Sequence, residues 1–239
     1  MLAFSGQIFC DFSGYSLCAI GAALCLGFHI PENFNSPYAA ASFSDFWRRW
    51  HISLSTWLRD YLYISLGGNR DGRVKTYRNL ILTMLIGGLW HGAAWGFIVW
   101  GMLHGLYLAM ERYLSERLAG WSTAVSTLWL WPRLAGVFLV VTLTWVFFRA
   151  PTLGRAIDML SSALGAGETV TPQLASMSNA LVGVTLGLLL SLQWSLRNIS
   201  IKDALERLAP AARVAVIAAM LVSIVLTSGD GRAFIYFQF

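Results

Sequence analysis

Long uncharged stretches alternate with short charged segments along this chain of 239 residues. The uncharged stretches that we take as membrane spans cover residues 12–31, 79–110, 134–148, 170–196 and 214–229. An α-helix of about 20 residues crosses the roughly 30 Å hydrocarbon core of a bilayer. The third and fifth stretches, of 15 and 16 residues, need flanking residues to reach the interfaces. The pattern predicts an all-α fold, a polytopic transmembrane helical bundle.

The longest uncharged run, residues 79–110, has room for 32 residues, too few for two full crossings. If the chain enters and leaves the membrane within this run, segments 30–78, 111–133 and 197–213 share one side and hold 14 of the 17 basic residues. Lys and Arg concentrate on the cytoplasmic side of membrane proteins. We therefore predict a broken or re-entrant helix pair, with Gly87–Gly88, Gly92 and Gly96 as the break points.

A segment before this run, Phe43–Leu62, is too polar to span a membrane. Its apolar residues recur at three- and four-residue steps, which places them on one helical face: Phe43, Phe46, Trp47, Trp50, Leu54, Trp57, Leu58 and Tyr61. Ser42 is the expected N-cap, with Asp45 in the first turn. A second stripe on the opposite side holds Arg48, His51, Ser55 and Arg59. The pattern predicts an interfacial amphipathic helix, on which His51 is either functional or one polar residue of a solvated face.

Composition strengthens the membrane interpretation. Hydrophobic residues make up 56% of the chain and charged residues 12%, about half the share in a typical soluble domain. The net charge is +5, and residues 44–78 alone carry +4, which favours a cytoplasmic segment beside anionic lipids. The basic residues alternate with aromatic ones and form no open polar patch, so we expect no nucleic-acid partner. Cys10, Cys18 and Cys25 are expected as buried core residues.

Two histidines lie in the uncharged run, His91 and His104. An ionisable group inside a membrane indicates a functional site by default, and histidine exchanges protons near neutral pH. The alternative for His91 is a hydrogen bond to a neighbouring helix. His104 follows thirteen residues later, about 220° around an unbroken helix, so we interpret it as a hydrogen-bonded packing residue. The four histidines show no ligand pair at helical spacing, and no metal site is expected.

Asp11 stands at the mouth of the first predicted span. A negative charge is favourable at a helix N-terminus, so a capping role is the first interpretation. The second is a pair with His51 or with an arginine of the amphipathic stripe.

These motifs together resemble the membrane-bound O-acyltransferase family, in particular its bacterial alginate O-acetyltransferase branch. The stretch from Phe43 to Arg70, FSDFWRRWHISLSTWLRDYLYISLGGNR, is similar to that branch's signature, and Leu89–Trp95, LWHGAAW, is similar to the block around the family's active-site histidine. The segments DFSGY at 11–15, PENFN at 31–35 and FIYFQF at 234–239 also fit.

The resemblance implies transfer of an acetyl group from a cytoplasmic thioester, acetyl-CoA or another acyl donor, toward hydroxyls of an exported polysaccharide. His91 matches the active-site histidine and would act as the general base that activates the hydroxyl. His51 matches the second histidine and would orient the donor or stabilise the oxyanion. As substrate-binding positions we assign Arg48, Arg59, Trp90 and Asp11.

Partners implied by the resemblance are membrane lipid, the acyl donor and other proteins of periplasmic polysaccharide acetylation, at a bacterial cytoplasmic (inner) membrane. We expect residues 1–239 to form one membrane-embedded acyltransferase domain that lacks N-terminal spans, because the chain resembles the C-terminal half of full members. Three other functions stay open: D-alanyl transfer to teichoic acid, a transporter with a histidine proton relay, and an inactive fragment.

Overall fold

The computed structural model describes residues 1–117, 127–166 and 176–227, and these residues are helical or irregular. Within those ranges the β-type pairing consists of one isolated bridge, between Phe34 and Trp50. The elements in chain order are α1 (Leu2–Cys25), η1 (Pro37–Ala39), α2 (Phe43–Trp47), α3 (Ile52–Trp57), η2 (Leu58–Tyr63), α4 (Arg73–His91), α5 (Trp95–Arg117), α6 (Thr127–Arg149), α7 (Leu153–Ala163), α8 (Ser176–Ser195), α9 (Ile201–Glu206) and α10 (Pro210–Thr227).

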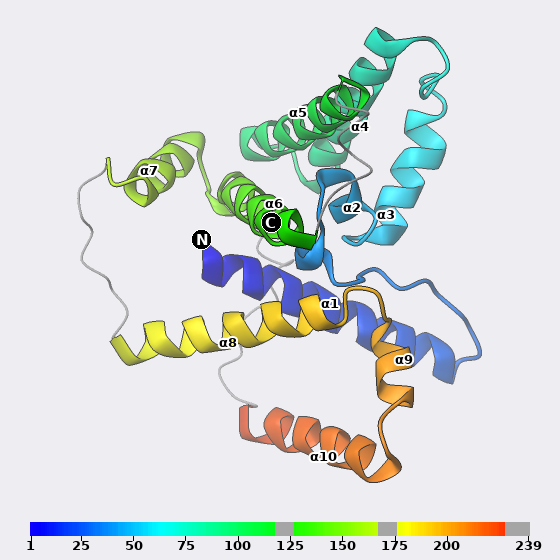
Figure 1. Ribbon diagram of the computed structural model, residues 1–239, viewed down its shortest axis with the longest axis vertical. Helices are drawn as coiled ribbons and strands as arrows, with labels where there is room; N and C mark the ends of the chain where they lie inside the picture. The colour runs from blue at the N-terminus through cyan, green and yellow to red at the C-terminus, as the bar shows by residue number, and fades with distance from the viewer. Residues whose placement is uncertain (118–126, 167–175, 228–239) are drawn as a thin grey trace.

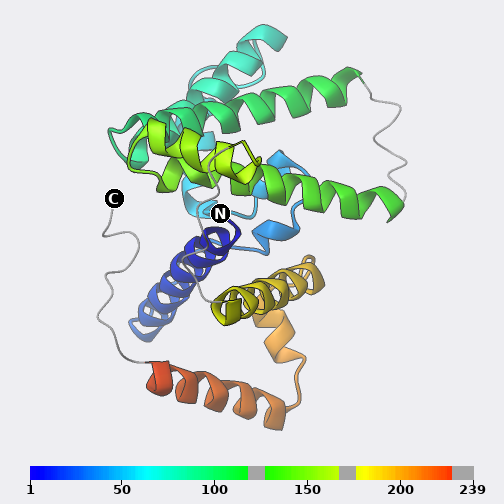
Figure 2. The same ribbon diagram turned by 90° about the vertical axis from the view of Figure 1, so that its left-hand side faces the viewer.

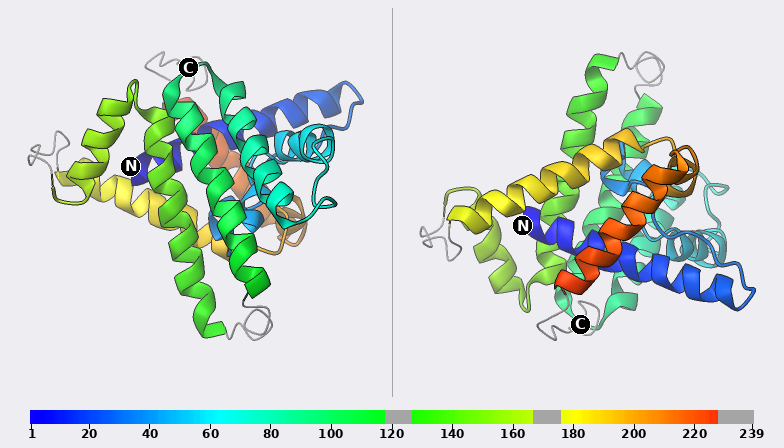
Figure 3. Two further views of the ribbon diagram at one scale, coloured as in Figure 1. Left: turned by 90° about the horizontal axis from the view of Figure 1, so that it is seen from above. Right: turned by 90° about the horizontal axis from the view of Figure 1, so that it is seen from below.

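Helices α4, α5 and α6 pack side by side, as the view from above shows (Figure 3). Below them in Figure 1, α1 contacts both α6 and α8. Helix α10 lies at the far end of the molecule from α4 and α5 (Figure 2), and its described side chains are exposed apart from Ala212. The short elements η1, α2 and α3 lie between these two groups of helices (Figure 1) and therefore contact both α5 and α8 through α2 and η1.

The predicted all-helical fold is confirmed for the described residues. Two helices are long and apolar enough to cross a membrane, Leu2–Cys25 and Trp129–Arg149, and two shorter apolar helices cover Asn179–Ser195 and Pro210–Leu226. The span expected at residues 134–148 is longer than the uncharged stretch, because α6 begins at Thr127. The closing hexapeptide at 234–239 lies outside the described residues.

The first span differs from its prediction in where it begins. Helix α1 starts at Leu2, ten residues before the expected start, so Asp11 lies in the middle turns of the helix. The capping role predicted for Asp11 is therefore wrong. The burial predicted for the three cysteines is also wrong, because all three are exposed on this helix.

The long uncharged run is confirmed as a broken helix pair. Helix α4 ends at His91, residues 92–94 make the turn, and α5 begins at Trp95. The break falls at Gly92, whose φ of +157° and close approach to the ring of Phe97 require glycine: a Cβ there would lie 2.7 Å from that ring. The two helices have 19 and 23 residues because each continues into its charged flank.

The other glycines of the pair serve packing. Gly88 of α4 faces the backbone of Phe97, and Gly101 of α5 faces the backbone of Met84, so close that a Cβ at either position would overlap a carbonyl oxygen. Small residues let two membrane helices approach closely. The prediction of Gly87–Gly88 and Gly96 as break points is wrong, since they lie inside the helices.

The segment predicted as one amphipathic helix is divided in two. Ser42 caps α2 as predicted: its Oγ accepts the amide of Asp45 at 3.0 Å. The helix then ends, because His51 adopts φ 44° and ψ 56°, and α3 and the π-turn η2 follow. The apolar side is buried as predicted at Phe46, Trp47, Trp50, Leu54 and Leu58, whereas Trp57 and Tyr61 are exposed.

Contacts from distant parts of the chain hold this segment. Glu111 of α5 accepts the amides of Phe43 and Ser44 at 2.5 and 3.3 Å, which satisfies free N–H groups at the start of α2. Arg197, which follows α8, donates to the carbonyl of Ala39 at 2.7 Å and to Asp45 Oδ2 at 3.3 Å. These bonds fix α2 between α5 and the end of α8.

The core beneath this segment is rich in aromatic residues. Four tryptophans, at positions 47, 50, 100 and 145, are at most 9% exposed and pack together with phenylalanines from α2, α5 and α6. His104 is fully buried among them. Its Nδ1 accepts the indole N–H of Trp47 at 3.3 Å, and its Nε2 lies 3.0 Å from Thr144 Oγ1. The prediction that His104 is a hydrogen-bonded packing residue is confirmed.

Candidate active site

His51 lies at the sharp turn between α2 and α3. Its φ of 44° is in the left-handed region, which costs a non-glycine residue about 1–3 kcal/mol and is found at functional sites. The neighbouring strand-like segment holds the turn: the amide of Asn35 donates to the carbonyl of Arg49, and the amide of Ile52 donates to the carbonyl of Asn33, both at 3.0 Å. Burial lowers the pKa of His51 to about 4, so its imidazole is neutral at neutral pH.

His91 is the last residue of α4, directly before the break at Gly92. Its half-buried ring is surrounded by aromatic rings of three helices, with centroid distances of 5.0 Å to Trp90, 5.1 Å to Phe148 and 5.4 Å to Trp100. Placement at a helix end, where the backbone turns, leaves the ring reachable from outside the bundle. The aromatic neighbours restrict its orientation.

The two histidines meet at Trp90. The indole of Trp90 is 6.2 Å from the ring of His51 and 5.0 Å from that of His91, measured between ring centroids. The two imidazoles are close enough that a charge on one acts on the other. Phe12 of α1 closes the side of His51 with an edge contact at 4.7 Å. Trp90 itself is 59% exposed, so it offers a free ring surface beside both histidines.

A cavity of about 490 Å³ opens beside this cluster. Its polar lining comes from Arg48 and Arg59, with Arg112 of α5, and from hydroxyl groups; its apolar lining comes from α3, α4 and α5: Trp47, Ile52, Leu58, Leu80, Met84 and Leu108. Met84 precedes His91 by about two helical turns, or roughly 10 Å along α4. The cavity therefore combines cationic groups with an apolar wall near the histidine pair.

The arginines of this cavity are partly neutralised. Arg59 makes two hydrogen bonds to the carboxylate of Asp60, at 2.7 and 3.1 Å, on an exposed surface. Arg48 lies 3.7 Å from Asp45 and donates to Ser44 Oγ at 3.3 Å. Among the described residues, Arg48 and Arg112 are thus the cationic groups nearest the apolar wall whose acidic partners are shared with other residues.

Of the predicted site residues, the structure brings His51, Trp90 and His91 together and places Arg48 and Arg59 in the adjacent cavity. Asp11 stands apart: it interacts with Gln7, one turn earlier in α1, and no ion pair of the described residues includes it. The second interpretation of Asp11, a pair with an arginine, is therefore wrong, and a role in substrate binding stays a prediction.

Sequence reasoning missed three residues around the histidines. Asn33 and Ser53 contact the turn that carries His51, and Phe148 of α6 contacts the ring of His91. The motif PENFN contains Asn33, but nothing in its spacing indicates that it pairs with residues 49–53. Phe148 is one of many phenylalanines, and its role depends on how α6 packs.

Comparison with known proteins places this geometry in a family. The sequence pattern of the membrane-bound O-acyltransferase family (MBOAT) matches residues 1–150, which include both histidines and the cavity. The chain belongs to the membrane-bound O-acyltransferase family. The predicted resemblance is confirmed, and with it the membrane-bound nature of the chain.

The chain is similar to several curated members of the family. It is 54% identical over 167 residues to the probable alginate O-acetylase AlgI of Azotobacter vinelandii, covering 70% of this chain and 32% of that protein. It is 48% identical over 164 residues to the peptidoglycan O-acetyltransferase of Helicobacter pylori, covering 69% and 31%. It is 34% identical over 125 residues to the teichoic acid D-alanyltransferase of Bacillus subtilis, covering 48% and 31%. The chain thus spans about a third of the length of the curated relatives it matches.

Proposed function

We propose that this chain carries the acyl-transfer site of a membrane-bound O-acyltransferase that moves an acetyl group from a thioester donor, acetyl-CoA or another acyl thioester, toward hydroxyls of an alginate-like exported polysaccharide. The observation that carries the proposal is the meeting of His51 and His91 at Trp90, beside a cavity lined by arginines. The similarity to alginate O-acetylases supports the acetyl group and the polysaccharide.

In this proposal His91 is the general base. A hydroxyl becomes an effective nucleophile when a neutral imidazole within hydrogen-bond reach takes its proton. The hydroxyl oxygen attacks the thioester carbonyl while the proton passes to His91, and a tetrahedral oxyanion forms. The carbon–sulfur bond then breaks, the proton returns to the leaving sulfur, and the acyl group stays on the oxygen. His51 orients the reacting groups or stabilises the oxyanion.

The cavity is the proposed donor site. Acyl thioesters such as acetyl-CoA combine an apolar acyl arm with anionic phosphates, and Arg48 and Arg59 with an apolar wall suit that combination. Trp90 presents an exposed ring for stacking against a substrate. The two helices α4 and α5 form the predicted re-entrant pair, with the basic loops on the cytoplasmic side of a bacterial inner membrane.

Acetyl-ester content of the cell-surface polysaccharide tests the proposal, in a strain whose only copy of this gene carries each variant at matched membrane levels. His91→Ala is expected to lower the ester content about a hundredfold or more, the size of a lost general base. His29→Ala is the matched control, because His29 is exposed in the loop after α1. Full ester content with His91→Ala would overturn the proposal.

A second function is favoured by one comparison. Similarity to the teichoic acid D-alanyltransferase of Bacillus subtilis supports D-alanyl transfer on the same histidine pair. Labelled acetate and labelled D-alanine, followed into surface polymer in parallel, separate the two. Label from D-alanine alone would replace the acetyl assignment and leave the roles of the histidines as proposed.

A further inference from the structure

The turn that carries His51 is held by one residue from far earlier in the chain, Asn33. Its backbone carbonyl accepts the amide of Ile52 at 3.0 Å. Its side-chain Oδ1 accepts the amide of Ser53 at 3.1 Å and the hydroxyl of Ser53 at 2.6 Å. Asn33 thus satisfies the first two N–H groups of α3, which His51, the N-cap residue, leaves without a side-chain cap. It acts as a remote cap on the helix that starts at His51.

The hydrogen positions at Ser53 determine those of His51. Asn33 Oδ1 is an acceptor only, so Ser53 Oγ must donate its single proton across the short 2.6 Å contact. The same oxygen lies 3.5 Å from His51 Nδ1, a long contact in which it has only lone pairs to offer. Nδ1 is therefore the protonated nitrogen of the neutral ring, and Nε2 carries the free electron pair.

We propose that Asn33 is a positioning residue that acts through Ser53 to fix the ring and the tautomer of His51, with the proton on Nδ1 and Nε2 free to accept. The consequence for catalysis rests on the proposed function. A neutral His51 in this tautomer accepts hydrogen bonds at Nε2 and donates none there. This favours a role in orienting a hydroxyl or the N–H of His91 over a role as oxyanion donor.

The first test reads the tautomer directly, without substrate. The full chain, labelled with 15N-histidine and reconstituted in bilayers, is measured by solid-state NMR, and the signals of His51 are assigned by their loss in His51→Gln. The expected spectrum has a protonated Nδ1 and an unprotonated Nε2. A protonated Nε2 in the unsubstituted protein would overturn the proposal.

Substitutions test whether Asn33 causes this state. Asn33→Leu has a similar shape but no acceptor and is expected to yield mixed tautomers, as is Ser53→Ala, which keeps the cap on the Ser53 amide and serves if Asn33→Leu does not fold. Asn33→Asp keeps the acceptor and is expected to keep the tautomer. The matched control is Asn35→Leu, because Asn35 is exposed and uses its backbone for its bonds to Arg49. A single tautomer in Asn33→Leu and Ser53→Ala would overturn the proposal.

Turnover then connects the tautomer to function. Asn33→Leu and Ser53→Ala are expected to lower kcat about tenfold to a hundredfold with little change in donor KM, and Asn33→Asp is expected to restore kcat. If the tautomer responds as expected but His51→Gln turns over normally, the positioning by Asn33 stands and the proposed role of His51 fails. If kcat falls in Asn33→Leu while the tautomer is unchanged, Asn33 is merely structural and the proposal is overturned.

Discussion

His104 Nε2 lies 3.0 Å from Thr144 Oγ1, and this one contact determines what the second histidine of the α4–α5 pair does. Thr144 Oγ1 donates its proton to the carbonyl of Val141 at 2.7 Å, so it accepts from His104. The other ring nitrogen accepts the indole N–H of Trp47. Both nitrogens of His104 are therefore used inside the core, and the ring is neutral and fully paired.

This network predicts a structural role for His104. His104→Ala leaves the indole of Trp47 without an acceptor and opens a cavity between α2, α5 and α6, so we expect a loss of about 2–4 kcal/mol in unfolding free energy. Thermal unfolding of the purified protein in detergent measures it, with the exposed His29→Ala as control. An unchanged Tm together with lost acyl transfer would instead assign His104 to the chemistry.

The two histidines of the uncharged run show what the sequence predicts well. Hydrophobic patterning predicted the helices, the break in the run and the buried side of residues 43–58, because each depends on residues close together in the chain. The angle of 220° between His91 and His104 assumed one helix; the break at Gly92 places them on α4 and α5 instead. Their separate surroundings follow from which helix each occupies.

What the sequence could not predict depends on contacts between distant segments. Asn33 caps α3 and Glu111 caps α2, and no local pattern pairs these residues with those helices. The expected single amphipathic helix failed for the same reason: the backbone bonds from residues 33 and 35 stabilise a left-handed conformation at His51 that local propensity disfavours. Tertiary packing overrides the local preference there.

The close packing of α4 and α5 yields a second prediction. In Gly101→Ala the new Cβ would overlap the carbonyl of Met84, so the helices must separate, at an expected cost of about 1–3 kcal/mol. Gly136→Ala in α6 is the control: a Cβ there meets nothing within 4 Å, and alanine is the better helix former. Chemical denaturation in detergent compares the two. Equal stability of both variants would show that the helix pair tolerates separation.

A third prediction concerns the link between α8 and the rest of the bundle. Arg197 donates to Ala39 and Asp45, while Gln193 accepts the amide of Tyr38 at 2.8 Å. Arg197→Ala removes the first two bonds and is expected to cost about 1–3 kcal/mol, because hydrogen bonds to charged groups are among the stronger ones.

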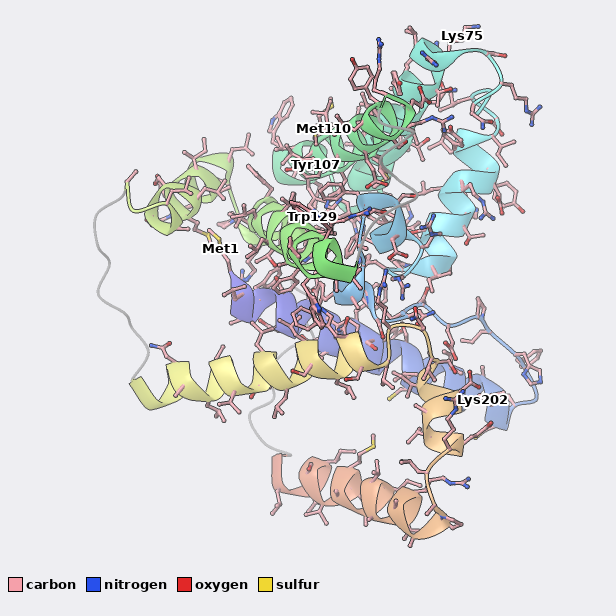
Figure 4. The ribbon with its side chains drawn as sticks, in the orientation of Figure 1. Met1, Lys75, Tyr107, Met110, Trp129 and Lys202 are labelled. Carbon is pink, nitrogen blue, oxygen red and sulfur yellow. The ribbon has the colours of Figure 1, made fainter. Side chains whose placement is uncertain are left out.

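Limited proteolysis and thermal unfolding measure this loss. The control is Arg155→Ala, since Arg155 is exposed on α7. Helix α8 docks away from Lys75, which stands at the outer end of α4, while Lys202 follows on α9 (Figure 4). Early cleavage is therefore expected in the connection after Arg197 and not near Lys75. Uniformly faster cleavage across the chain would contradict a local role.

The last prediction uses the pKa of His51, which burial lowers from its ordinary value of 6.5 to about 4. Between these two pH values the unfolded chain binds more protons at this residue than the folded chain does, so the contribution of His51 to stability falls as the pH falls. Above pH 7 the ring is neutral in both states and the contribution is constant. The titratable group facing it is His91 of α4, whose charge would oppose protonation further.

The difference in unfolding free energy between the unsubstituted protein and His51→Gln isolates this term. We expect the difference to be constant above about pH 7 and to decrease in the unsubstituted protein's disfavour from pH 6.5 to pH 4, because glutamine takes up no proton. Denaturation series in detergent at several pH values measure it. A difference that does not vary with pH would mean that His51 is as accessible to protons in the folded protein as in the unfolded chain, and the burial that keeps its Nε2 free to accept would be lost as an argument.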